Sequence, residues 1–195
     1  NLPILKAHAS MVFSGALKNI KGVVQDKVHM QMHQKNLTMA MMDVWSVCRA
    51  DINIMDAMHA ASGYSPHMPV PIDTDMILGS KDPVAIDRVA CEVTGIDTSS
   101  VDYFRVAEET GLGNYSMDMI DVVGDSIEDC YKKMWIPYIG DMSTRWPEYD
   151  VRCQGACSSC QALLAINMEE LKAVDEYEKN KGMTVVIGSK NEIPK

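Results

Sequence analysis

The segment from Asp82 to Gly95 carries the clearest helix signals in the chain. Asp82 is a residue type that caps helix N-termini, and Pro83 follows at the first helical position, where its missing N–H costs nothing. Apolar residues then recur at helical spacing until Gly95, which is typical of a helix end. Short apolar segments alternate with helical ones along the chain. This alternation predicts an α/β fold with a layered, largely parallel sheet and flanking helices.

The other elements are predicted from apolar spacing and turn residues. Expected strands are 2–9, 51–58, 76–78, 120–123 and 184–187. Expected helices are 37–47, 102–109, 127–134 and 161–178. The polar segment 28–34 and the Pro-rich segment 62–75 are predicted to be loops. The connection 135–149 then separates an α/β core domain, residues 1–134, from residues 135–195, which hold a cysteine loop, a helix and a final strand that packs on the core.

The composition is that of a soluble globular protein, with 47% hydrophobic and 23% charged residues among 195. No apolar run reaches the roughly 20 residues that cross a bilayer. The net charge of −9 argues against binding to nucleic acid or to anionic membranes, which need a basic surface. Six cysteines and sixteen methionines favour a reducing, cytoplasmic setting. Because the chain opens at Asn1 on an interior-like segment, we expect it to be a fragment. Its oligomeric state is left open.

Three cysteines within eight residues, Cys153, Cys157 and Cys160, have the spacing C-x3-C-x2-C. Thiolates this close can converge on one soft metal centre, and Gly155 permits a tight loop around it. The loop precedes an apolar helix, whose N-terminus favours an anionic cluster. We therefore expect these three residues to bind an iron–sulfur cluster, such as 4Fe–4S. A fourth ligand would come from another cysteine, a histidine or another chain.

Zinc is the main alternative metal, although structural zinc sites usually combine two paired halves and only one is visible here. Isolated thiols or a redox disulfide are the alternatives without a metal. The same spacing opens the radical-SAM signature, but there it follows an early barrel strand. Here it lies near the end of the chain, so that interpretation is rejected.

Basic residues gather in the first 22 positions of this acidic chain: Lys6, His8, Lys18, Asn19 and Lys21. If they converge, they would suit a phosphate or carboxylate group, whereas a solvated surface is the structural alternative. His8 is a candidate acid or base because histidine titrates near neutrality. Asp56 is expected at a strand end, where α/β sheets bind ligands. Catalytic candidates are therefore His8, Lys18 and Asp56.

Several phrases together resemble the family called domain of unknown function 362, over roughly residues 1–125. They are Asn1–His8, Gly15–Gly22, Asp82–Asp87, Arg105–Gly113 and Val122–Gly124. Members are commonly described as iron–sulfur cluster-binding proteins with ferredoxin-like cysteines, so the resemblance implies an α/β fold, a cytoplasmic and often anaerobic setting, and a ferredoxin-like module or other redox partner. It also implies one shared substrate site made of Lys6, His8, Lys18, Asn19, Lys21, His33, Asp56, Asp82 and Asp87.

This chain departs from the ferredoxin pattern because it lacks a C-x2-C-x2-C-x3-C run. From the residues alone, Asp82 is explained as a helix cap. For Asp87, a solvent-facing position explains the residue equally well. The leading hypothesis is an iron–sulfur protein of redox or electron transfer, with a basic N-terminal site for an anionic small molecule. The alternatives are a zinc-stabilised, non-catalytic binding domain and a cluster-free enzyme that uses His8, Lys18 and Asp56.

Overall fold

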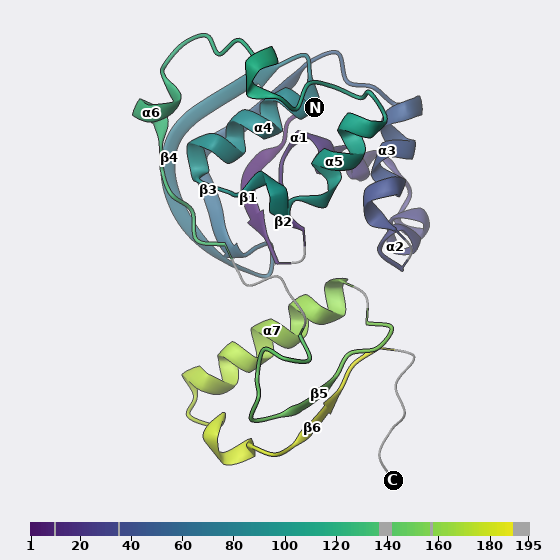
Figure 1. Cartoon of the computed structure of the whole chain (residues 1–195), viewed down its shortest axis with the longest axis vertical. Coiled ribbons are helices and arrows are strands. Elements are labelled where there is room, and N and C mark those ends of the chain that lie inside the picture. Colours follow the sequence, from purple (N-terminus) through teal and green to yellow (C-terminus); the bar gives the residue numbers. More distant parts are fainter. Residues whose placement is uncertain (10, 35, 137–141, 157, 189–195) are drawn as a thin grey trace. The chain divides into compact units, whose positions relative to one another are not determined.

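The computed structural model describes residues 1–9, 11–136, 142–156 and 158–188, except residue 35. The chain divides into two compact units, residues 1–137 and residues 138–195. Figure 1 shows the elements of both units. In the described part of the chain, no helix is both long enough and apolar enough to cross a membrane.

The first unit is built on a four-stranded sheet of order β2-β1-β3-β4. Its strands are β1 (Ile4–His8), β2 (Val12–Ser14), β3 (Asn53–Tyr64) and β4 (Met68–Ser80). β1 is parallel to β3, but β2 pairs with β1 and β4 pairs with β3 in the antiparallel direction. The predicted α/β class is confirmed. The predicted largely parallel order is wrong for this sheet, because two hairpins supply most of its pairing.

The larger hairpin joins β3 and β4, and it includes the Pro-rich segment that was predicted to be a loop. Pro69 lies opposite Gly63 and Pro71 lies opposite Ala61. Prolines are tolerated here because β4 is an edge strand, so their missing N–H groups break no second ladder. The predicted strand 76–78 is only the last part of β4. The proline-rich composition of residues 62–75 therefore led to a loop prediction for a segment that contains most of β4.

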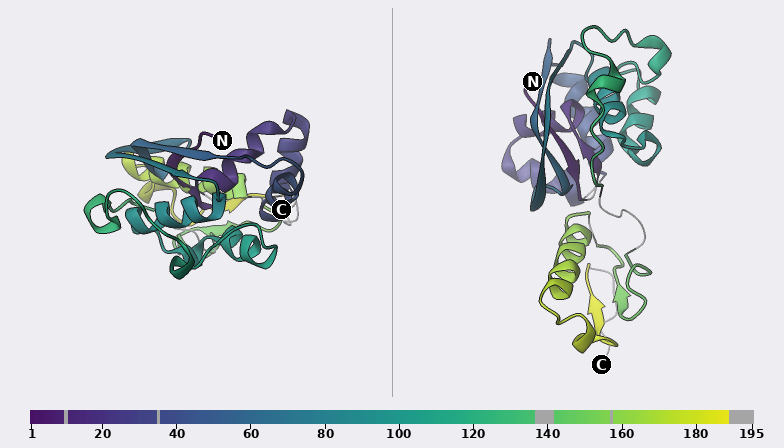
Figure 2. Two further views of the ribbon diagram at one scale, coloured as in Figure 1. Left: turned by 90° about the horizontal axis from the view of Figure 1, so that it is seen from above. Right: turned by 90° about the vertical axis from the view of Figure 1, so that its left-hand side faces the viewer.

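Helices cover one side of the sheet and extend beyond its β2 edge (Figures 1 and 2). The helices of this unit are α1 (Ala16–Asn19), α2 (Asp26–Gln34), α3 (Leu37–Val47), α4 (Pro83–Thr94), α5 (Asp102–Glu109) and α6 (Ile127–Cys130). Short 3-10 helices are η1 (Ile20–Val23), η2 (Thr98–Ser100) and η3 (Met117–Met119). α4 packs on β3 and β4. The hydrophobic core of this unit includes Leu5, Phe13, Trp45, Met55 and Tyr103.

The ends of α4 match their sequence signals. The Asp82 side chain accepts from the N–H groups of Val84 and Ala85, and Gly95 ends the helix with φ of 65°. In α3, the Asn36 side chain accepts from the N–H of Met39 and caps the helix. These helices were predictable because their capping interactions are local in sequence.

Two predictions about short segments are wrong. Residues 28–34, expected to be a loop, belong to α2, which buries Met32 and exposes most of its polar side chains. Residues 120–123, expected to be a strand, pair with no described strand, and the Val123 side chain is 94% exposed. In both cases the hydrophobic pattern was too short to distinguish a helix, a strand and an extended connection.

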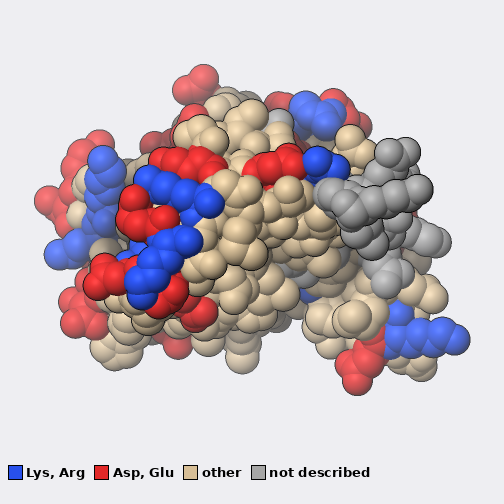
Figure 3. Space-filling view, turned by 90° about the horizontal axis from the view of Figure 1, so that it is seen from below, with Lys and Arg blue, Asp and Glu red and all other residues tan. Residues whose placement is uncertain are grey.

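The second unit has strands β5 (Asp150–Arg152) and β6 (Thr184–Val186), which pair in parallel, and helices α7 (Ser158–Ala173) and η4 (Glu178–Asn180). The Tyr149 and Tyr177 rings contact each other, and the Tyr149 hydroxyl donates to the Tyr177 carbonyl. Exposed ion pairs join Lys172 to Glu169 and Lys179 to Glu176. On the face in Figure 3, Lys and Arg are interspersed with Asp and Glu.

Candidate functional site

β1 presents Lys6 and His8 on one face, because successive side chains of a strand alternate. Leu5 and Ala7, on the other face, are completely buried in the core. Lys6 is partly buried, and His8 is only 9% exposed. In the β1–β2 hairpin, His8 lies opposite Val12, a β-branched residue with φ of 65°. Such a backbone conformation is costly for valine and is held here by the surrounding structure.

The short helix α1 is fixed by a buried carboxylate on α4. Asp87 accepts hydrogen bonds from the backbone N–H groups of Ala16 (2.5 Å) and Leu17 (2.9 Å). The Trp45 indole donates to the Leu17 carbonyl at 2.9 Å. Asp87 is completely buried, so the solvent-facing alternative for this residue is wrong. Burial raises the pKa of Asp87 to about 7, although both backbone hydrogen bonds act to lower it.

Lys18 follows directly from this anchored turn and is only 8% exposed. Within the described chain, no hydrogen bond or ion pair is found for its amine. Burial lowers the pKa of Lys18 to about 7, and the positive charges of Lys21 and Lys6 lower it further. A buried lysine without a counter-charge is unusual, since a buried charge is normally paired.

Lys21, on η1, is also 8% exposed, and burial lowers its pKa. Its Nζ lies 2.6 Å from His33 Nε2, and when protonated it donates to that nitrogen. The His33 pKa falls to about 4, through burial and then the charges of Lys21 and Lys18. The other ring nitrogen, Nδ1, is buried and has no hydrogen-bond partner among the described residues. Of the two ring nitrogens of His33, only Nε2 therefore has a hydrogen-bond partner among the described residues.

Helix α2 also brings His29 beside His33, with ring centroids 5.6 Å apart. The two histidines are four residues apart, a spacing that places them on one helical face. Because segment 28–34 was predicted to be a loop, this relationship was missed. The H-x3-H spacing was the sequence signal that could have revealed it.

Lys6, His8, Lys18, Lys21 and His33 thus form one group, called here the basic cluster. The charges that act on the His8 pKa come from Lys18, Lys21, His33 and Lys6. Burial is the largest cause that lowers the His8 pKa, and together with these charges it brings the pKa to about 2. His8 is therefore a neutral imidazole at physiological pH in the protein alone. The arrangement concentrates positive potential in a poorly hydrated place, which suits an anion.

Three residues expected in the same site lie in other settings. The Asn19 amide donates to Asn1 Oδ1 at 2.7 Å, and Asn19 is exposed. Asp56 lies in the middle of β3 and accepts from the N–H of Met58, so its expected strand-end position is wrong. Asp82 caps α4 and also accepts from the N–H of Asn114 at 2.7 Å. The structure therefore assigns Asp82 a positioning role in the fold.

The predicted metal ligands are only partly described. Cys153 follows β5 and Cys160 lies in the first turn of α7, and both are partly buried. Between them, Ala156 N–H donates to the Cys153 carbonyl and closes a turn. Cys157 lies outside the described residues. Within the described ranges, no three His, Cys, Asp or Glu side chains form a group that could hold a metal ion.

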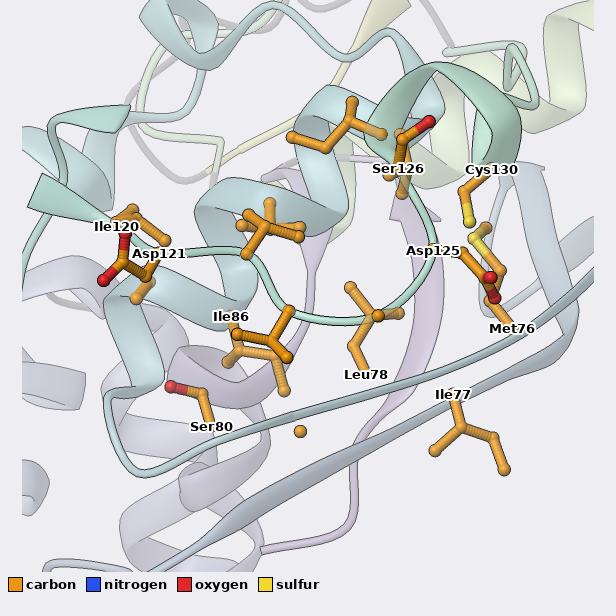
Figure 4. Close-up of a pocket in the computed structure, with 18 of the residues that line it drawn as sticks. Met76, Ile77, Leu78, Ser80, Ile86, Ile120, Asp121, Asp125, Ser126 and Cys130 are labelled. Carbon is orange, nitrogen blue, oxygen red and sulfur yellow. The ribbon is translucent and has the colours of Figure 1, made fainter. Parts of the chain in front are cut away.

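A separate cavity of about 340 Å³ lies between β4, α4 and the segment 120–127 (Figure 4). Apolar side chains such as Leu78 and Ile86 line it, and Asp121 and Asp125 lie on the segment that borders it. None of the residues predicted from the sequence as site residues lines this cavity.

Comparisons with known proteins support part of the resemblance seen in the sequence. Residues 1–92 match the model of the domain of unknown function family DUF362. This range contains the whole basic cluster. The chain is also similar to the thylakoid-associated protein sll1697 of Synechocystis, with 25% identity over 118 residues. That match covers 57% of this chain and 37% of the relative, so the chain corresponds to a minor part of it. No solved structure matches significantly.

Proposed function

We propose that the N-terminal unit binds a small anion, a phosphate- or carboxylate-bearing molecule, at the basic cluster. The observation that carries this proposal is the environment of Lys18. Its amine is buried, lies near the charges of Lys21 and Lys6, and makes no ion pair with a described residue. An anion would supply the missing charge and would raise the pKa of these groups again. The buried Nδ1 of His33 also lacks a partner and supports this proposal.

The family match does not name a substrate, so the proposal is limited to the chemistry of the ligand. Three lysines and two imidazoles offer donors to several oxygens at once, which favours a polyoxyanion over a halide. Burial strengthens each contact because the local dielectric constant is low. Whether the site also catalyses a reaction depends on His8 and Lys18. The proposed catalytic role of Asp56 has no support, because its side chain is exposed on β3.

Calorimetric titration with inorganic phosphate and with citrate tests the proposal. We expect saturable binding by the full chain and at least about a tenfold loss of affinity in Lys18→Met and in Lys21→Met, since each removes a charged donor. Lys27→Met is the matched control, because Lys27 is exposed on the same helix that carries His33. Absence of binding to the wild-type protein at millimolar concentrations of both anions would exclude this function.

We also propose that the second unit binds an iron–sulfur cluster used in redox or electron transfer in a cytoplasmic setting. The support is local: the loop that carries Cys153 leads from β5 into the first turn of α7, which holds Cys160. Free N–H groups at such a helix end favour thiolates. A bound cluster would supply one-electron chemistry, and the thiols would hold its iron. Zinc at the same thiols is the alternative metal.

Metal analysis of anaerobically prepared protein separates these possibilities. For a bound cluster, we expect the wild-type protein to contain iron and sulfide. Both should be lost in Cys160→Ser and retained in Cys48→Ser. Cys48 is a suitable control because it is an exposed thiol in the first unit. One zinc with no iron would favour the structural zinc site. If the protein contains neither iron nor zinc after anaerobic reconstitution, the cysteines have no metal-binding role.

A further inference from the structure

The basic cluster contains one lysine that differs from the other two. Lys21 contacts His33 at 2.6 Å, and Lys6 is more exposed and lies near the Ile4 carbonyl. Lys18 is buried, and no hydrogen bond or ion pair with another described residue engages its amine. It therefore has the surroundings of a nucleophile more than those of a structural ion pair.

We propose that the anion bound by the basic cluster also carries an aldehyde or ketone, and that the Lys18 amine condenses with this carbonyl to form an imine. This inference rests on the proposed anion-binding function and specifies the class of its ligand. The lysine nitrogen attacks the carbonyl carbon and forms a C–N bond. The resulting carbinolamine loses its hydroxyl as water, so that an amine and a carbonyl give an imine and one water. No oxidant, reductant or metal is required.

The chemistry requires an uncharged amine, because an ammonium group has no lone pair. Burial and the charges of Lys21 and Lys6 bring the Lys18 pKa to about 7. At neutral pH this corresponds to a free-amine fraction about a thousandfold larger than that of an ordinary lysine with a pKa near 10.4. In the free protein, the charges of Lys21 and Lys6 favour the neutral amine and attract the ligand's anionic group. The bound anion offsets part of these charges, while burial, the largest cause, still lowers the Lys18 pKa.

The position of the amine is fixed by the fold. Lys18 belongs to α1, whose first N–H groups are held by Asp87 and whose Leu17 carbonyl is held by Trp45. A nucleophile on an anchored backbone loses little freedom when the ligand binds. Lys21 and Lys6 would hold the anionic group while the carbonyl reaches Lys18. The expected ligand is therefore a small oxo acid or a phosphorylated carbonyl compound.

Borohydride trapping tests the inference with pyruvate as the probe. The full chain is incubated with pyruvate at pH 7 and reduced, and the modified lysine is located by peptide mass mapping. We expect one reduced adduct, at Lys18, which is absent in Lys18→Arg and retained in Lys27→Arg. Acetone, which has the carbonyl but no carboxylate, should give no selective adduct, and phosphate should compete with pyruvate. Because mapping is done on the wild-type chain, the result does not depend on how a variant folds.

The outcomes separate this inference from the function on which it rests. Calorimetric binding of phosphate without a reducible pyruvate adduct overturns the imine and leaves anion binding intact. Labelling that is scattered equally over exposed lysines also overturns the imine. An adduct confined to Lys18 that phosphate does not displace supports the imine and contradicts the shared anion site. Selective labelling with phosphate competition supports both.

Discussion

The carboxylate of Asp87 accepts a 2.9 Å hydrogen bond from the backbone N–H of Leu17, a residue seventy positions earlier in the chain. Through this contact, helix α4 fixes the first turn of helix α1. Lys18 follows immediately, so a buried acid that does not touch the basic cluster determines where one of its lysines lies. Asp87 is therefore a positioning residue for the candidate site.

Gly15 permits the close approach of this carboxylate. A Cβ atom at position 15 would overlap Asp87 Oδ1 and the Phe13 ring. We expect Gly15→Ala to lower the free energy of unfolding by about 2 kcal/mol or more, because a buried contact must shift. At Gly22, a Cβ would meet nothing within 4 Å, so Gly22→Ala should change stability by less than about 0.5 kcal/mol. Urea unfolding measures both, and equal effects would contradict the proposed close contact.

The raised pKa of Asp87 predicts a pH-dependent stability. Its pKa is 3.8 in the unfolded reference and about 7 in the fold, so between these values the folded protein binds more protons. The contribution of Asp87 to stability is therefore greatest at low pH and falls as the pH rises to about 7, by at most about 1.4 kcal/mol per pH unit. Asp87→Asn should lack this dependence. Parallel profiles for wild type and variant would show that Asp87 has an ordinary pKa.

Replacement of the buried Lys18 should stabilise the protein while it weakens anion binding. The lowered pKa of Lys18 means that the unfolded chain binds more protons between about pH 7 and 10.5, so wild-type stability should rise with pH in that range. Lys18→Met removes this cost, and we expect it to be more stable at pH 6 by about 1 kcal/mol or more. Lys27→Met should change stability little. A less stable Lys18→Met would indicate a structural role for the amine.

The affinity for an anion should depend on pH through the protein. Sulfate keeps its charge across neutral pH, so a change in its affinity reports the basic cluster. Because Lys18 loses its proton near pH 7, we expect sulfate to bind about three- to tenfold more weakly at pH 8 than at pH 6. Calorimetry at constant ionic strength measures this ratio. The ratio should approach one in Lys18→Met if Lys18 is the titrating group.

The histidines give a spectroscopic test of the cluster. Burial and neighbouring cations lower the pKa of His33 to about 4 and that of His8 to about 2. In nitrogen-detected NMR titrations, both rings should stay neutral at pH 6. Saturating sulfate should raise the His33 pKa, since an anion offsets the charges of Lys21 and Lys18. Ordinary titration of His33 near pH 6.5 in the free protein would disprove the buried cluster.

Two of the helices that were predicted correctly from the sequence have ends that carry capping residues. Asp82 and Gly95 delimit α4, and Asn36 caps α3, because a cap acts within a few residues of itself. Segments 28–34 and 62–75 were assigned incorrectly. Their polar and proline-rich compositions are typical of loops, and only packing against β3 makes 68–75 a strand.

The sequence by itself determined which charged residues were candidates: Lys6, His8, Lys18 and Lys21 lie close together in the chain and suggest an anion site. It also determined the spacing of the three cysteines. The family resemblance also named His33, but only the tertiary structure showed its contact with Lys21, the burial of Asp87, and the different settings of Asn19 and Asp56. The physical reason is that burial and long-range charge determine the pKa of a group, and both arise from contacts between residues distant in sequence.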